Sequence, residues 1–306
     1  RGKSFFSKLK AFLAFLLTGF YFLVKIWPFK TLNKKETPLI AFGGYVSLAA
    51  FFYFKGPVYL QEQNTIPGSV SRLLVSTKKV KKVFCGFKQT QNYFKKISKE
   101  ENRIILSGNP VSPNFHTLYK ENKNKFLQNI EMKILILGGS QGSKSLNLIL
   151  PKALFNIEEL FVKHQCGKNN FDETEITYQK YTNDKNKIEI IEYIDNIHEY
   201  YGWADIIICR AGALTVSEVS ASGSLGIFIP LPWAIDNHQF FNAKQLKDLN
   251  AGFLIEENKN LEQDLIKILN DIKKIEIDKL RIMKENAYKA YIKSPERKIY
   301  DEVAEK

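Results

Sequence analysis

The sequence predicts an α/β protein built from two doubly wound parallel sheets, and three observations lead to this prediction. Short apolar runs recur along the chain, and most are separated by stretches long enough for a helix, which is typical of parallel strands covered on both faces. Glycine-rich turns follow two of the runs, and a polar, turn-rich segment divides the chain. With 306 residues, 44% of them hydrophobic, the chain is long enough for two domains with separate cores.

The first half of the chain is expected to hold four strands. They lie within residues 38–44, 58–64, 82–87 and 103–109. The turn formers from Ser107 to Pro113, followed by a Lys- and Asn-rich stretch, indicate the domain boundary. We therefore expect a first domain over residues 1–111, completed by a C-terminal helix over 291–306, and a second domain over 112–290.

The second half restarts with a clean strand and its own glycine-rich turn. Its six expected strands lie within residues 133–139, 161–167, 187–193, 204–210, 225–231 and 252–257. Two doubly wound domains that face each other would form a cleft, and such domains bind ligands at the carboxyl ends of their strands. The loops after the strands are therefore the expected place of a ligand site.

The net positive charge of the chain does not identify its binding partners. The net charge is +13, but only six of the 45 basic residues are Arg, and Lys, Asn and Ile are abundant throughout. A general compositional bias explains this charge as well as a nucleic-acid or membrane partner does. The sequence contains no Arg cluster and no aromatic stacking motif, so we expect no nucleic-acid partner.

The spacing of the cysteines and acidic residues in the sequence matches no common metal-binding motif. Cys85, Cys166 and Cys209 show no C-x-x-C spacing, so neither a disulfide framework nor a zinc site is expected, and packed thiols in a reducing, cytosolic compartment are inferred. No D-x-D stretch occurs in the sequence. We therefore expect no metal held by paired carboxylates and no cofactor.

Residues 9–30 form the most apolar stretch, which a membrane span, a signal peptide or an interfacial helix would explain. Only Ala11 to Val24 are uncharged between two lysines, and they reach about 21 Å as a helix, whereas a bilayer core is about 30 Å thick. A signal peptide would need small residues at a cleavage site, and bulky residues follow Val24 instead. The length favours a core or interfacial helix.

A glycine-rich turn opens the second half, in the stretch "KILILGGSQGSKSLN". Gly138, Gly139 and Gly142 let the backbone approach a phosphate, and the helix start after them offers free N–H groups to an anion. The stretch nearly spells a P-loop, but Ser143 stands where that motif needs its second glycine. ATP hydrolysis is therefore disfavoured, while a tight turn without a ligand stays an open alternative.

A second strand, glycine turn and helix follow in "ADIIICRAGALTVSEVSAS". Glu218 falls about one helical turn beyond the turn, where a carboxylate can accept hydrogen bonds from ribose hydroxyls, although an ordinary acid at a helix start would look the same. The later loop "PWAIDNHQFFNA" carries amide and imidazole groups suited to sugar hydroxyls. His238 in that loop is as compatible with a solvated residue as with a ligand contact.

Five stretches together resemble the MurG family of peptidoglycan glycosyltransferases. They are "FGGYVS", "EQNTIPG", "GGSQGSKSLN", "CRAGALTVSE" and "DNHQFFNAKQL", and they occur in the family's order over nearly the whole chain. The resemblance implies two Rossmann-like domains facing a cleft, of the GT-B type. It also implies transfer of N-acetylglucosamine from its UDP donor to lipid I (undecaprenyl-pyrophosphoryl-MurNAc-pentapeptide), which gives lipid II.

The resemblance also implies roles for individual residues. The backbone of Ile194 would pair with uracil, the turn at Ser140 would hold the diphosphate, and Glu218 would take the ribose. The full set implied for the UDP-sugar is Asn64, Ser140, Gln141, Gly142, Ile194, Ala213, Leu214, Thr215, Val216, Ser217, Glu218 and Gln239. Gly44 and Tyr45 would border the acceptor.

The chain departs from the family pattern at several places. Ser112 stands where the family usually has Arg, so weaker binding of the UDP-sugar is expected. The family's first glycine-rich loop, with its histidine, would precede Arg1, so the first domain is expected to be incomplete here and the upstream frame to encode that loop. Without it, Glu62 is the local candidate for the catalytic base. A non-catalytic UDP-sugar-binding membrane protein and a lipid glycosyltransferase with another acceptor remain alternatives.

The resemblance gives residues 9–30 a role at the membrane. In the family, a hydrophobic patch with basic neighbours seats the enzyme as a peripheral protein on the cytoplasmic face of the bacterial inner membrane. Phe12, Phe15, Leu16 and Trp27 would enter the interface, and nearby lysines would meet anionic headgroups. Some of these apolar side chains are also expected to pack in the core.

The interfacial interpretation predicts that high salt or alkaline carbonate releases much of the protein from membranes, because salt screens the attraction between lysines and headgroups. Changing Phe12, Phe15 and Leu16 to Ser should reduce vesicle binding in a sedimentation assay and leave UDP affinity intact. Retention in the carbonate pellet, with protease protection of only one flank, would instead identify a membrane-spanning anchor.

Overall fold

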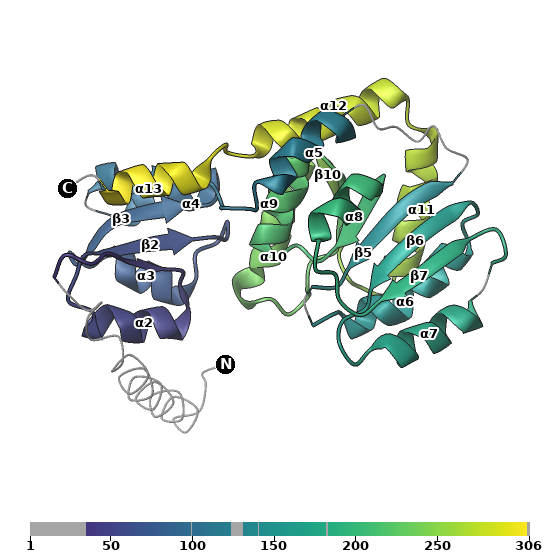
Figure 1. Cartoon of the computed structure of the whole chain (residues 1–306), viewed down its shortest axis with the longest axis horizontal. Helices are drawn as coiled ribbons and strands as arrows, with labels where there is room; N and C mark the ends of the chain where they lie inside the picture. Colours follow the sequence, from purple (N-terminus) through teal and green to yellow (C-terminus); the bar gives the residue numbers. More distant parts are fainter. Residues whose placement is uncertain (1–34, 99, 124–130, 140, 182, 305–306) are drawn as a thin grey trace. The chain divides into compact units, whose positions relative to one another are not determined.

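The computed structural model describes residues 35–98, 100–123, 131–139, 141–181 and 183–304 (Figure 1). It contains two compact units. The described residues up to Asn109, together with those from Lys293 onward, form unit 1, and Pro110–Ile292 form unit 2. The apolar stretch at residues 9–30 lies outside the described residues. Within the described part of the chain, no helix is both long and apolar enough to span a bilayer.

Unit 1 is a parallel four-stranded sheet with strand order β1-β2-β3-β4. The strands are β1 (Leu39–Ala41), β2 (Val58–Glu62), β3 (Val80–Cys85) and β4 (Ile104–Leu106). The helices are α2 (Gly44–Tyr53), α3 (Ser69–Val75), α4 (Lys88–Ile97), the short η2 (Glu101–Arg103) and the C-terminal α13 (Pro295–Ala304). Ile299 of α13 packs on Tyr59 and Phe84, so this last helix covers one face of the sheet.

Unit 2 is a parallel six-stranded sheet with strand order β10-β9-β8-β5-β6-β7. Its strands are β5 (Met132–Leu137), β6 (Leu160–Gln165), β7 (Lys187–Ile191), β8 (Ile206–Cys209), β9 (Leu225–Phe228) and β10 (Gly252–Leu254). The chain order reverses between β5 and β8, and this is the topological switch point at which doubly wound sheets bind ligands.

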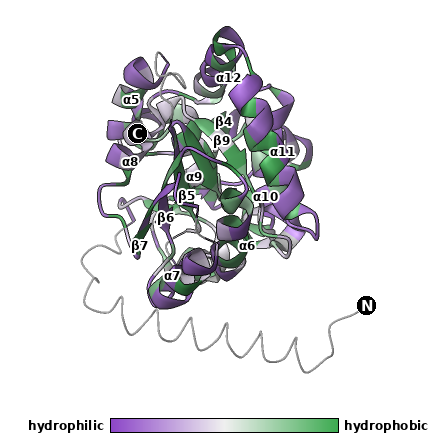
Figure 2. Cartoon of the chain, turned by 90° about the vertical axis from the view of Figure 1, so that its right-hand side faces the viewer, coloured by the Kyte–Doolittle hydropathy of each residue, from purple (hydrophilic) through white to green (hydrophobic). Residues whose placement is uncertain are grey.

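Helices cover both faces of the larger sheet (Figure 1). They are α5 (Asn114–Asn122), α6 (Lys144–Phe155), α7 (Phe171–Lys180), α8 (Ile197–Trp203), α9 (Ala213–Ser222), η3 (Ile235–Asn237), α10 (His238–Asp248), α11 (Leu261–Lys274) and α12 (Ile277–Ala290). Leucines of α6 and α11 close over Ile134 and Ile136 of β5 in one buried cluster. Figure 2 shows hydrophobic residues along the inner strand β9.

The predicted fold class is confirmed. Each of the ten apolar runs in the sequence overlaps one of the ten strands described, and every strand pair in both sheets is parallel. Fully buried strands such as β8 and β9 are continuous apolar runs because both of their faces are covered by helices.

A buried polar network joins β6 to the helices beside it. His164 is fully buried, with Nδ1 3.0 Å from the Tyr178 hydroxyl and Nε2 3.1 Å from Oδ1 of Asn147. The Asn147 amide nitrogen donates to the carbonyl of Cys166 at 2.9 Å, so Oδ1 is left to accept the Nε2 proton of a neutral imidazole. Burial lowers the pKa of His164 to about 3. The network therefore fixes the Cys166 carbonyl with an uncharged histidine.

Candidate functional site

The main pocket of unit 2 lies at the switch point of its sheet. It has a volume of about 720 Å³ and is bordered by Leu137 at the end of β5 and Arg210 directly after β8. The starts of α6 and α9 also reach it, through Ser143 and Gly212. The first N–H groups of a helix lack partners within the helix and carry its positive dipole end. Two helix starts at one pocket make it suited to an anion.

The turn between β5 and α6 has room only for glycine at two positions, Gly138 and Gly142. Gly142 has φ +72°, and a Cβ there would lie 1.8 Å from the carbonyl oxygen of Cys166. A Cβ on Gly138 would lie 2.5 Å from the amide nitrogen of Ser143. The turn is thus pressed against the loop after β6, and Gly138 leaves the amide at the start of α6 uncovered by a side chain.

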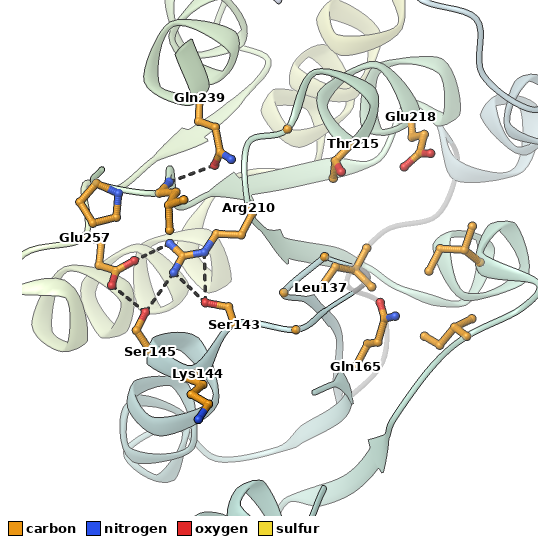
Figure 3. A pocket seen from close by; sticks show the side chains of 18 of the residues that line it. Leu137, Ser143, Lys144, Ser145, Gln165, Arg210, Thr215, Glu218, Gln239 and Glu257 are labelled. Carbon is orange, nitrogen blue, oxygen red and sulfur yellow. Dashed lines mark hydrogen bonds and ion pairs between the residues drawn. The ribbon is translucent and has the colours of Figure 1, made fainter. Parts of the chain in front are cut away.

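Asn170 fastens the two loops together. Its side-chain nitrogen lies 3.3 Å from the carbonyl oxygen of Gln141 and 3.1 Å from that of Cys166. Lys144, which follows the turn, is exposed and lines the pocket, and its side chain points away from Arg210 in Figure 3.

The start of α9 brings a carboxylate to the other end of the pocket. Thr215 and Glu218 both line the pocket, and the hydroxyl of Tyr201 donates to Oε2 of Glu218 at 3.2 Å. Burial raises the pKa of Glu218, and the hydrogen bond from Tyr201 opposes that rise. Tyr201 is itself fully buried and packs edge-on against Phe115, with ring centroids 4.9 Å apart. It holds Glu218 toward the pocket.

Arg210 is a buried cation in the pocket wall, and sequence reasoning missed it as a site residue. Its side chain hydrogen-bonds to Ser143 and Ser145 and forms an ion pair with Glu257 (Figure 3). The available signal was a charged residue placed directly after a fully apolar strand, in "ADIIICR". A charge is rarely buried unless it is paired, so the sequence could have flagged the position but not its partners.

The loop after β9 borders the same pocket with Leu231, Pro232 and Trp233. The loop is held to α10, because Gln239 accepts a hydrogen bond from the Leu231 amide at 3.0 Å. Asp236 and Asn237 both have positive φ, at +54° and +52°, which is uncommon for residues other than glycine. The chain thus turns sharply before α10, and Gln239 faces the pocket.

The pocket brings together five of the residues expected to bind a UDP-sugar: Gly142, Ile194, Thr215, Glu218 and Gln239. The other expected residues of α9 are placed beside it, with Ala213, Val216 and Ser217 buried and Leu214 exposed. Gln141 is exposed in the turn, and Ser112 is exposed before α5, away from the pocket lining. Ser140 lies outside the described residues.

The residues expected on the acceptor side belong to unit 1. Gly44 and Tyr45 begin α2. Glu62 ends β2 and is 5% exposed; Oε1 accepts from the Asn64 amide at 3.0 Å and Oε2 from the Gly68 amide at 3.1 Å. The carboxylate is thus occupied in holding the loop that carries Asn64. The role of Glu62 as a catalytic base stays a prediction.

Comparison with known proteins identifies glycosyltransferases as relatives of this chain. The model of the glycosyltransferase family 28 C-terminal domain matches residues 133–303. Two curated relatives are named UDP-N-acetylglucosamine–N-acetylmuramyl-(pentapeptide) pyrophosphoryl-undecaprenol N-acetylglucosamine transferase. The Pseudoalteromonas atlantica protein is 38% identical over 77% of this chain and 63% of its own length. The Francisella philomiragia protein is 38% identical over 88% of this chain and 74% of its own length.

A solved structure gives the same result. MurG from Acinetobacter baumannii matches with a TM-score of 0.73 and 29% identity, over 95% of this chain and 78% of that one. The fold and the pocket therefore define a glycosyltransferase with two Rossmann-like units, of the GT-B type. Within that class, the chain belongs to the MurG family.

The raised pKa of Glu218 predicts that Glu218→Gln stabilises the protein. The raised pKa means that Glu218 binds its proton more tightly in the folded protein than in the unfolded chain. Its contribution to the free energy of unfolding is therefore most favourable below the pKa of the unfolded chain, and it is lost as pH rises through the raised pKa of the folded protein. Gln keeps an oxygen for Tyr201 and has no charge to bury. We expect a higher Tm than wild type at pH 7 and a smaller difference at pH 4.

The control for this measurement is Glu173→Gln, since Glu173 is exposed in the first turn of α7. An acid there interacts favourably with the helix dipole, so its removal should not raise the Tm. An equal or lower Tm for Glu218→Gln at pH 7 would contradict the argument that burial of the charge is costly.

Proposed function

We propose that this chain transfers N-acetylglucosamine from UDP-N-acetylglucosamine to lipid I, which yields lipid II. The observation that carries the proposal is one pocket that combines two helix starts with a carboxylate one helical turn further on. Such a pocket matches a nucleoside diphosphate, whose phosphates prefer helix starts and whose ribose offers hydroxyls to an acid. Membership of the MurG family and the names of the relatives support the sugar and the acceptor.

The nucleoside would lie at the Glu218 end of the pocket. The carboxylate of Glu218, oriented by Tyr201, would accept hydrogen bonds from the ribose hydroxyls. Ile194 is buried in the wall beside it, where its backbone would pair with uracil. Ile197 also lines this part of the pocket, and its apolar side chain suits the face of a base.

The diphosphate would lie between the two helix starts. On one side are Ser140, Gln141 and Gly142 of the turn before α6, and on the other are Ala213, Leu214, Thr215, Val216 and Ser217 of α9. Cleavage of the bond to the sugar leaves additional negative charge on UDP. Helix N–H groups stabilise that charge more than they stabilise the bound donor, which is the differential interaction that lowers a barrier. Gln239, at the start of α10, would reach the sugar.

The acceptor would bind on unit 1, bordered by Gly44 and Tyr45. Glu62 would act as the residue that positions Asn64, through the bonds it accepts within their loop. We further propose a peripheral location on the cytoplasmic face of the inner membrane, where an anionic surface would attract this chain of net charge +13.

A second candidate is a UDP-sugar-binding protein without transferase activity. Two observations favour it: Glu62 is engaged in its loop, and Ser112 stands away from the pocket lining. The donor site would then be intact and the catalytic base missing. A glycosyltransferase with a different lipid acceptor is the remaining alternative.

The proposal predicts that the full chain binds UDP in calorimetry and that Glu218→Ala weakens this binding about tenfold, because a hydrogen-bonded charge contact to the ribose is lost. Glu173→Ala, which removes an exposed acid on α7 of the same unit, should leave UDP affinity unchanged. Unchanged affinity in Glu218→Ala would remove Glu218 from the site.

The acceptor is tested with radiolabelled UDP-N-acetylglucosamine, by supplying lipid I or diacylglycerol to the wild-type chain. Label transferred to lipid I supports the proposed reaction. Label transferred only to diacylglycerol would contradict it in favour of another lipid glycosyltransferase. UDP binding without transfer to either lipid would favour the non-catalytic candidate.

A further inference from the structure

Arg210 joins three separate segments of unit 2 at one guanidinium group. Toward the start of α6, Nη2 lies 2.7 Å from the Ser143 hydroxyl and 3.0 Å from the Ser145 hydroxyl. Toward the end of β9, Nη1 lies 3.2 Å from the Ile229 carbonyl oxygen and 3.3 Å from that of Pro230. Toward the loop after β10, Nη1 forms an ion pair with Glu257 (Figure 3).

The contacts of Arg210 leave its N–H groups occupied within the protein. An arginine side chain has five N–H donors. Nε donates to Ser143 at 3.2 Å, Nη2 has the two serine hydroxyls, and Nη1 has two carbonyls and the carboxylate of Glu257. Arg210 is also 8% exposed. Arg210 therefore affects a ligand by positioning the segments that it contacts, and not by donating hydrogen bonds to the ligand itself.

The segments it holds carry different parts of the pocket. Ser143 is the residue that precedes α6, so its position sets the direction of the helix start that faces the pocket. Pro230 leads into Leu231, whose amide donates to Gln239. Ser145 and Glu257 are also joined directly, by a 2.6 Å hydrogen bond. One rigid group thus connects the helix start to the loop after β9, which is hydrogen-bonded to Gln239 of α10.

We propose that Arg210 is a positioning residue of the donor site, which couples the diphosphate-binding turn to the loop after β9 that is hydrogen-bonded to Gln239. This inference rests on the proposed function, because it takes the pocket to hold a UDP-sugar. Glu257 balances the charge of Arg210 and orients its plane. Lysine cannot replace Arg210, because a single ammonium group lacks the fixed fork of N–H donors with which a guanidinium contacts all three segments.

The test compares uridine, UDP and UDP-N-acetylglucosamine by calorimetry on the full chain, in wild type, Arg210→Lys and Arg210→Met. Uridine contacts the Glu218 end, which Arg210 does not hold, so its affinity should change less than twofold. UDP affinity should fall about tenfold in both variants, since the helix start is no longer fixed. UDP-N-acetylglucosamine should lose at least as much, because Gln239 is displaced as well.

Two further variants keep the test decisive. Glu257→Gln keeps a hydrogen-bond acceptor for Arg210 and should lower UDP affinity less than Arg210→Met does. Arg281→Lys is the matched control, because Arg281 is exposed on α12 and paired with Asp278 at 2.6 Å; it should leave the affinities for all three ligands unchanged.

The outcomes separate this inference from the function on which it rests. An equal loss of uridine and UDP affinity in Arg210→Lys would mean that Arg210 only stabilises the fold, and would overturn the inference. Unchanged UDP affinity in Arg210→Met would overturn it as well. Failure of the wild-type chain to bind UDP at all would overturn the proposed function and this inference together.

Discussion

The pocket of unit 2 depends on the contact between two backbone segments, the turn at Gly142 and the loop at Cys166 and Gly167. A Cβ on Gly142 would lie 1.8 Å from the Cys166 oxygen, and one on Gly167 would lie 2.4 Å from the Gln141 oxygen. Neither turn can carry a side chain at that contact. The close approach lets the chain turn from the end of β5 at Leu137 into α6 at Lys144, so that the first N–H groups of α6 border the pocket.

Buried polar side chains stabilise this contact between the turn at Gly142 and the loop at Cys166. Asn147 and Asn170 both donate to the Cys166 carbonyl, at 2.9 and 3.1 Å, and His164 holds Asn147 in turn. Because these groups are buried, a broken bond would leave an unsatisfied polar atom at a cost of about 1–3 kcal/mol. The network therefore makes one arrangement of the turn strongly preferred, as a preformed ligand site requires.

The sequence predicts well whatever depends on neighbours along the chain. The strands appear as apolar runs, and the two turns appear as glycines after a strand, because both are local consequences of burial and backbone conformation. Contacts between residues far apart cannot be found this way. Nothing near Arg210 in the sequence indicates Glu257, and nothing near Glu218 indicates that Tyr201 donates to it. Glu62 illustrates the same limit: nothing in the sequence indicates that its carboxylate accepts hydrogen bonds from the Asn64 and Gly68 amides.

UDP is expected to bind across the two helix starts of unit 2, and a crystal structure of the chain with UDP tests this most directly. The predicted result places the diphosphate between the turn at Gly142 and the start of α9, with the ribose hydroxyls on Glu218 and the Arg210 contacts to Ser143 and Glu257 intact. UDP bound elsewhere on the chain, or a diphosphate turned away from both helix starts, would contradict the account.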